Sequence, residues 1–156
     1  MSLAQWLLAL HVTAAFLLVG GTVVAATFRV LAQTRERPSE IALFLGLTRV
    51  AVVLISVGVI AALVFGLWLV HELDYSWGDA WIWLSLLLWI VLNAAGGIGG
   101  RRERELREHA ERLAAECDAP SAELRAEMGD PVALALNVIG GLAVLAILAL
   151  MIWKPA

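Results

Sequence analysis

The chain has 156 residues, 62% of them hydrophobic, and a formal net charge of -3. Several long apolar runs in so short a chain exclude a soluble domain and predict an integral membrane protein. The single cysteine, Cys117, excludes an internal disulfide and a cysteine-based metal cluster within one chain. We therefore expect an all-α fold in which residues 1–156 form one membrane domain, an antiparallel bundle of four transmembrane helices.

The first apolar run predicts a membrane span over residues 5–28, which contains the ionisable residue His11. We expect a retained span rather than a signal peptide, because the run is long and has neither a basic start nor a clear cleavage site. A neutral imidazole inside the bilayer is costly, which makes His11 a candidate functional residue. We also expect this helix to be central in the bundle. Small residues predict close helix contacts in the first and last apolar runs; they are Ala14, Ala15, Gly20, Gly21, Ala25, Ala26, Gly140 and Gly141.

A short polar connection, residues 29–40, follows the first span. Ser39 is predicted to cap the next helix, whose apolar pattern begins at Ile41 and whose membrane span covers residues 49–70. Arg49 stands at the expected membrane boundary. We interpret it as an anchor whose charged group reaches the lipid headgroups.

The stretch after the second span reads FGLWLVHELDYSWGDA and mixes charged with aromatic residues. Tryptophan and tyrosine concentrate where hydrocarbon meets headgroups, so this stretch predicts an interfacial loop. Ser76 and Asp79 have the spacing of a capping box for a third span over residues 80–100. That span ends with Gly96 and Gly100, whose GxxxG spacing predicts tight helix packing.

Residues 101–130 are predicted to form a helical connection outside the membrane. Charges of both signs recur four residues apart through residues 101–116, which predicts a helical extension of the third span, and a short helical turn is expected over residues 121–128. His109, in this extension, is predicted to be a solvated surface residue. Asp130 is a predicted N-cap and Pro131 the first residue of a fourth span over residues 131–153. An apolar stripe predicts that the extension lies on its own neighbours; it consists of Leu106, Ala110, Leu113 and Cys117.

The positions of the arginines predict the orientation in the membrane. They follow the first and third spans, whereas the N-terminus and the loop after the second span contain none. By the positive-inside rule, both termini lie outside the cytoplasm in a multi-pass protein of the cell's plasma or inner membrane, and the extension is cytoplasmic. His11, His71 and Met151 then share the outer half of the bundle.

Three stretches carry a resemblance to known proteins: LHVTAAFLLVGG at residues 10–21, FGLWLV at residues 65–70, and the ending IWKP. They resemble the superfamily that contains the CopD copper-resistance membrane domain, the HemJ type of protoporphyrinogen oxidase, and uncharacterised four-helix families. We identify the chain as a member of one of these uncharacterised families. In HemJ a first-helix histidine is implicated in heme binding, and its position matches His11.

The resemblance does not extend to the HemJ reaction. HemJ carries a functional lysine in its third helix, where this chain reads WIWLSLLLWIV. It also carries an arginine and an Asn-Glu pair in the fourth helix, where this chain has only Asn137. With no other catalytic constellation in the sequence, we do not expect an enzyme of the HemJ kind.

Three functions remain open. In the first, His11 binds heme b, with His71 as the candidate second axial ligand. In the second, copper or another metal is held at the outer face by His11, His71 and Met151, a mixed set that suits copper. In the third there is no cofactor: His11 hydrogen-bonds a threonine or a carbonyl across the bundle, and the protein is an accessory or scaffold subunit. The expected partners are the lipid bilayer and either further copies of the chain or subunits of a membrane complex. Nucleic acid is not expected, because the arginines alternate with glutamates.

Overall fold

The computed structural model describes residues 2–154, so Met1 and the last two residues of the chain, including the proline of the IWKP ending, lie outside the described part. Within it the structure is all helical, as predicted. The elements are α1 (Leu3–Gln33), α2 (Pro38–Glu72), α3 (Ala80–Glu116), α4 (Ala122–Met128) and α5 (Pro131–Trp153). Four helices are long and apolar enough to cross a membrane. The predicted extension of the third helix is confirmed, because α3 continues unbroken well beyond its apolar part.

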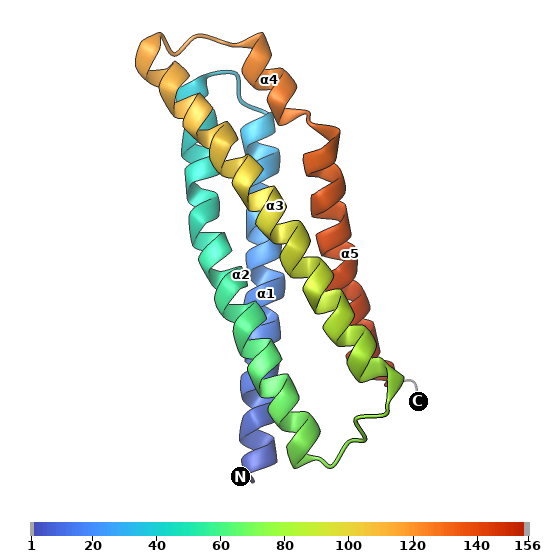
Figure 1. Cartoon of the computed structure of the whole chain (residues 1–156). Coiled ribbons are helices and arrows are strands. Elements are labelled where there is room, and N and C mark those ends of the chain that lie inside the picture. Colours follow the sequence, from blue (N-terminus) through green and yellow to red (C-terminus); the bar gives the residue numbers. More distant parts are fainter. Residues whose placement is uncertain (1, 155–156) are drawn as a thin grey trace.

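The long helices run in alternating directions, so their connections gather at two ends of the bundle (Figure 1). One end holds residues 34–37 and α4, and we call it the charged end because the arginine-rich segments lie there. The other holds residues 73–79 and both ends of the chain, and we call it the terminal end. α1 packs along α2 and α3 packs along α5, while the two pairs meet mainly through α2 and α3.

Local sequence explains where several helices begin. Ser2 and Gln5 form a reciprocal capping box at the start of α1. At the start of α5, the Asp130 carboxylate accepts a hydrogen bond from the backbone N–H of Val132, and Pro131 occupies the first helical position. Both features of α5 were predicted, and both follow from the unpaired N–H groups that every helix start must satisfy.

Two predicted caps are wrong. Ser39 lies inside the first turn of α2 rather than before it, and its backbone N–H and hydroxyl each donate to the Asp118 carboxylate at 2.8 Å. Ser76 Oγ accepts a hydrogen bond from the Gly78 N–H, and Asp79 is the N-cap of α3 without a side-chain hydrogen bond. In both cases the serine hydroxyl makes a hydrogen bond to a loop residue instead of capping the helix.

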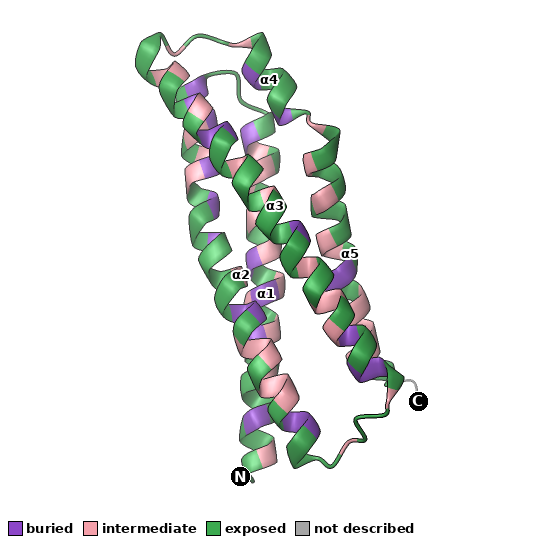
Figure 2. Ribbon diagram, viewed as in Figure 1, coloured by how far each residue is buried: buried purple, intermediate pink, exposed green. Residues whose placement is uncertain are grey.

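Buried apolar residues form three clusters along the bundle (Figure 2). The charged-end cluster consists of Ala32, Ile41, Leu45, Leu106, Ala110, Leu124 and Met128. The middle cluster consists of Leu18, Val59 and Val144, and the terminal-end cluster of Val70, Trp81 and Ile82. Many other large apolar side chains point outward, including Phe16, which is 73% exposed. An apolar outer surface is what helices in a bilayer require.

α1 and α2 approach each other closely, and this approach depends on glycine. A Cβ atom on Gly21 would lie 2.8 Å from Ile55 Cγ1, and one on Gly58 would lie 2.6 Å from the backbone nitrogen of Leu18. Side chains larger than hydrogen would therefore force the helices apart at these points. Gly21 was predicted to lie at a helix contact and is confirmed, whereas Gly58 was not singled out from the sequence.

The remaining predictions about small residues are only partly right. Ala14 is 2% exposed and its carbonyl oxygen lies against Gly58 of α2, so its predicted place at a helix contact is confirmed. A Cβ on Gly20 or Gly141 would meet no atom within 4 Å, and one on Gly140 would make only an ordinary contact with a leucine side chain. Gly96 and Gly100 also have no neighbour within 4 Å in the described part of the chain. The helix that carries Gly20 is not central, because α1 packs chiefly along α2. The spacing of small residues does not reveal which face of a helix turns towards a neighbour.

The predicted stripe on the extension of α3 is confirmed. Leu106 and Ala110 are buried in the charged-end cluster, and Leu113 packs against that cluster. Cys117 lies exposed at the end of the helix, so the stripe ends one turn earlier than predicted. The extension thus lies on α1, α2 and α4 rather than standing free in solvent.

Among the charged contacts of the extension, those with other segments outnumber the one along its own helix. The one ion pair at four-residue spacing within residues 2–154 joins Arg107 to Glu111 at 3.3 Å. The ion pairs that link separate segments are Arg29 with Glu103, Arg102 with Asp130, and Arg125 with Glu36. The His109 imidazole also contacts the Glu127 carboxylate.

Candidate functional site

His11 projects from α1 against the terminal half of α2. Its Nδ1 atom lies 2.9 Å from the backbone carbonyl oxygen of Ala62. The ring occupies a notch in α2 at Gly66, where an added Cβ would lie 3.0 Å from the imidazole Cε1. The side chain is partly buried. The contacts with α2 thus determine the position and the orientation of the His11 ring.

The hydrogen bond to Ala62 determines which ring nitrogen of His11 is free. A carbonyl oxygen can only accept, so Nδ1 must be the donor in this contact. In the neutral imidazole the other nitrogen, Nε2, then carries the lone pair. No hydrogen bond to this atom occurs among residues 2–154. The site therefore offers one oriented, basic nitrogen beside a helix surface.

The structure places the other two predicted ligands apart from His11. His71 is exposed at the last turn of α2, five residues beyond Gly66, where the His11 ring packs, and so about 7.5 Å further along the helix axis. Met151 lies near the end of α5, which packs chiefly along α3. All three belong to the terminal half of the bundle, as predicted, but no hydrogen bond joins them in the described structure.

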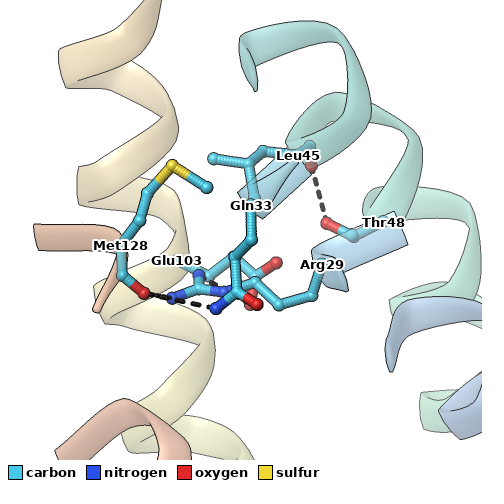
Figure 3. Close-up of polar contacts among 6 residues, drawn as sticks. All are labelled: Arg29, Gln33, Leu45, Thr48, Glu103 and Met128. Atoms are coloured by element: carbon cyan, nitrogen blue, oxygen red, sulfur yellow. Dashed lines mark hydrogen bonds and ion pairs between the residues drawn. The ribbon is translucent and has the colours of Figure 1, made fainter. Parts of the chain in front are cut away.

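A second polar site lies at the charged end, where four helices meet (Figure 3). The Arg29 guanidinium donates to the backbone carbonyl of Met128 at 3.2 Å, and the Gln33 amide donates to the same oxygen at 3.4 Å. Arg29 Nη1 also lies 4.0 Å from the Glu103 carboxylate. The Thr48 hydroxyl, buried nearby on α2, donates to a carbonyl of its own helix. We call these side chains the Arg29 cluster.

The Arg29 cluster opens into a cavity of about 670 Å³ at the charged end. Burial raises the pKa of Glu103, while the Arg29 guanidinium and the Thr48 hydroxyl act in the opposite direction. Asn137, on α5, lines the same cavity. The cavity therefore combines charged side chains of both signs, a carboxyl group that resists ionisation and an amide, a set that can bind ions or polar groups.

His109 contradicts its predicted role as a solvated surface residue. Its side chain is only 17% exposed, and its Nδ1 lies 2.8 Å from the carboxylate of Glu127 on α4. The prediction failed because the sequence shows a histidine among charged residues but not that α4 folds back over it. Glu123, one turn before Glu127, stands beside the same pair.

The Arg29 cluster was missed from the sequence because its members lie far apart along the chain. Arg29 was assigned to a polar connection and Glu103 to a solvated extension. One signal was available: Arg29 directly follows the last residue of the predicted first span, so its side chain had to leave the apolar region and find a partner. The identity of that partner depends on how α3 crosses α1.

A family model described as "Predicted integral membrane protein (DUF2269)" matches residues 5–155. No curated protein and no solved structure matches the chain. The prediction of an uncharacterised membrane family is confirmed, and the wider resemblance to CopD and HemJ stays a prediction.

Proposed function

The chain belongs to the DUF2269 family of predicted integral membrane proteins, and we propose that it binds heme b with His11 Nε2 as the axial ligand. One observation carries this proposal: Nδ1 is committed to the Ala62 carbonyl, which leaves the Nε2 lone pair without a partner in the described structure. An unpaired acceptor in an apolar environment is costly, and an iron atom would satisfy it.

The surroundings of His11 fit the role of an iron ligand. Metal-binding histidines commonly donate their second ring N–H to a carbonyl, which fixes the tautomer and the ring orientation. Ala62 supplies that carbonyl, and the absence of a side chain at Gly66 leaves space for the imidazole. Heme would supply one-electron chemistry when bound. The chain itself would supply the oriented nitrogen and an apolar, water-poor setting.

The proposal uses His11 alone. A second histidine on the same iron would have to approach within about 4 Å of the first ligand atom, since iron and zinc bind nitrogen at about 2 Å. His71 is exposed at the end of α2, five residues and so about 7.5 Å of helix beyond Gly66, against which the His11 ring packs. The same separation weighs against a copper site that shares His11, His71 and Met151, and metal analysis of the purified protein tests that alternative.

For the orientation, we infer that both termini face outward and the charged end faces the cytoplasm of a plasma or inner membrane. The support is the distribution of arginine between the two ends of the bundle. His11, five residues after Trp6 in α1, then lies in the outer half of the membrane. Heme at this position would be reached from the outer side.

The test is an absorption spectrum of the full chain, purified in mild detergent from heme-replete cells. We expect a Soret band, and we expect His11→Ala to lose or shift it. Removing one interhelical hydrogen bond costs only about 0.6 kcal/mol in membrane proteins, so this variant is expected to stay folded. His71→Ala is the matched control and should keep the wild-type spectrum.

Two results would overturn the heme proposal. One is a colourless wild-type protein, and the other is an unchanged spectrum in a folded His11→Ala variant. In either case His11 would be a hydrogen-bonding link between α1 and α2, and the protein a cofactor-free membrane subunit. Copper in the purified protein that disappears in both histidine variants would select the metal-handling alternative.

A further inference from the structure

Three potential metal ligands meet at the charged end, far from His11. They come from two helices: His109 from α3, and Glu123 and Glu127 from α4. One imidazole nitrogen and one carboxylate oxygen from each glutamate all lie within 4.8 Å of one another. Within the described residues, this is the one group of three or more histidine, cysteine or acidic side chains with such spacing.

The packing of α4 on α3 brings these side chains together. Glu123 and Glu127 are four residues apart and project from one face of α4. The adjacent face carries Leu124, which is 1% exposed and packs in the charged-end cluster with Ala110 of α3. Because Ala110 directly follows His109, the same packing that docks α4 brings the imidazole to the two carboxylates.

The charges of this group are unbalanced. His109 contacts Glu127, but no ion pair to Glu123 occurs in the part of the chain that the structure describes. Two carboxylates at four-residue spacing on a helix repel each other. A protonated imidazole would neutralise only one of them. A divalent cation would neutralise both and accept the imidazole nitrogen as a third ligand.

We propose that His109, Glu123 and Glu127 bind a divalent first-row transition-metal ion such as Zn²⁺, which clamps α4 to the extension of α3. Carboxylate oxygen and imidazole nitrogen are ligands of such ions, with bonds of about 2.0 to 2.2 Å. Those bonds require ligand atoms about 3 to 4 Å apart. Spacings within 4.8 Å reach this range through small side-chain rotations.

The surroundings of the site favour a solvent-accessible ion whose remaining coordination positions are filled by water. Glu123 and Glu127 are exposed, so the ion can enter from solvent. His109 and Glu127 also line the 670 Å³ cavity, whose nearest arginine along α3 is Arg112. The other two arginines of the cavity are engaged elsewhere: Arg102 with Asp130, and Arg29 with Glu103 and a backbone carbonyl.

The test is calorimetric titration of the full chain with Zn²⁺ in mild detergent, after treatment with a chelator and its removal. We expect one ion per chain. His109→Ala and Glu127→Gln should each weaken binding at least about tenfold, which is the low end of the effect of disturbing a metal site. Amide exchange in α4 should slow when Zn²⁺ is added to the wild type and should not change in His109→Ala.

Controls separate this site from other zinc ligands of the chain. His71→Ala removes another exposed histidine, Cys117→Ser removes the exposed thiol, and Glu116→Gln removes an exposed carboxylate of α3. Each should bind Zn²⁺ like the wild type, and so should His11→Ala, because the site is independent of heme. The proposal is overturned if the wild type binds no ion at millimolar Zn²⁺, if the folded ligand variants bind as tightly as the wild type, or if Cys117→Ser abolishes binding.

Discussion

Glu103 is a glutamate that the fold keeps in a setting unfavourable to its charge. Its side chain is 26% exposed, and the Arg29 guanidinium stands 4.0 Å away, too far for a close ion pair. Burial outweighs that attraction and raises the pKa of Glu103 above its usual value of 4.5. The folded state therefore binds this proton more tightly than the unfolded chain does.

This raised pKa predicts a pH-dependent stability. Below about pH 4.5 the carboxyl is protonated in both states and burial costs nothing extra. As the pH rises above that value, the unfolded chain ionises freely while the folded state resists, so stability falls. We expect Glu103→Gln to gain thermal stability relative to the wild type as the pH is raised towards neutrality, measured by melting in detergent.

The control for this experiment is Glu116→Gln, which removes an exposed glutamate from the same helix. This variant shows the effect of removing a carboxylate that is not buried. The prediction is contradicted if, between acidic and neutral pH, the melting temperature of the wild type rises relative to that of Glu103→Gln. Such a rise would mean that attraction to Arg29 outweighs burial.

At the scale of elements, the pairing of α1 with α2 rests on backbone-to-backbone approach. At Gly58, an added Cβ would lie 2.6 Å from the Leu18 nitrogen and 2.8 Å from the Ala14 carbonyl oxygen. Neither atom can move without shifting α1 as a whole. Further along α2, Gly66 leaves the space that the ring of His11 occupies.

This contact predicts opposite effects for two alanine substitutions in α2. Gly58→Ala should lower stability, because overpacking a tight contact costs about 1 to 3 kcal/mol. Gly46→Ala is the matched control, since a Cβ there meets nothing within 4 Å. It should be neutral or stabilising, because alanine favours helix over glycine by about 1 kcal/mol. Thermal melting of both variants in detergent checks the pair, and equal melting temperatures would exclude the close approach of α1 and α2.

At the scale of the whole molecule, the proposed orientation can be tested by labelling with a membrane-impermeant thiol reagent. Ser76, in the loop between α2 and α3, and Cys117, at the far end of α3, are both exposed and lie at opposite ends of the bundle. We expect Ser76→Cys, in a Cys117→Ser background, to be labelled on intact cells. Native Cys117 should react only after the membrane is opened. Labelling with the reverse pattern would invert the proposed topology.

The sequence by itself determined the helices and most of their limits. Runs of apolar residues long enough for a bilayer specify spanning helices, because backbone polar groups in lipid must be satisfied within the segment. The start of α5 at Asp130 and Pro131 and the docked stripe of Leu106 and Ala110 were also predictable. These features depend only on residues close together in the chain. His11 stood out for a similar reason, as an ionisable residue within an apolar run.

Only the tertiary structure decided which residues meet. The contacts of His11 with Ala62, of Arg29 with Glu103, and of His109 with α4 join segments that the sequence leaves unconnected. In a membrane protein, lipid-facing and protein-facing surfaces are both apolar, so hydrophobicity does not indicate the rotation of a helix about its axis. That rotation brought Gly58 rather than Gly20 into the contact between α1 and α2. The crossing of α3 over the other helices gathered charged side chains around one cavity.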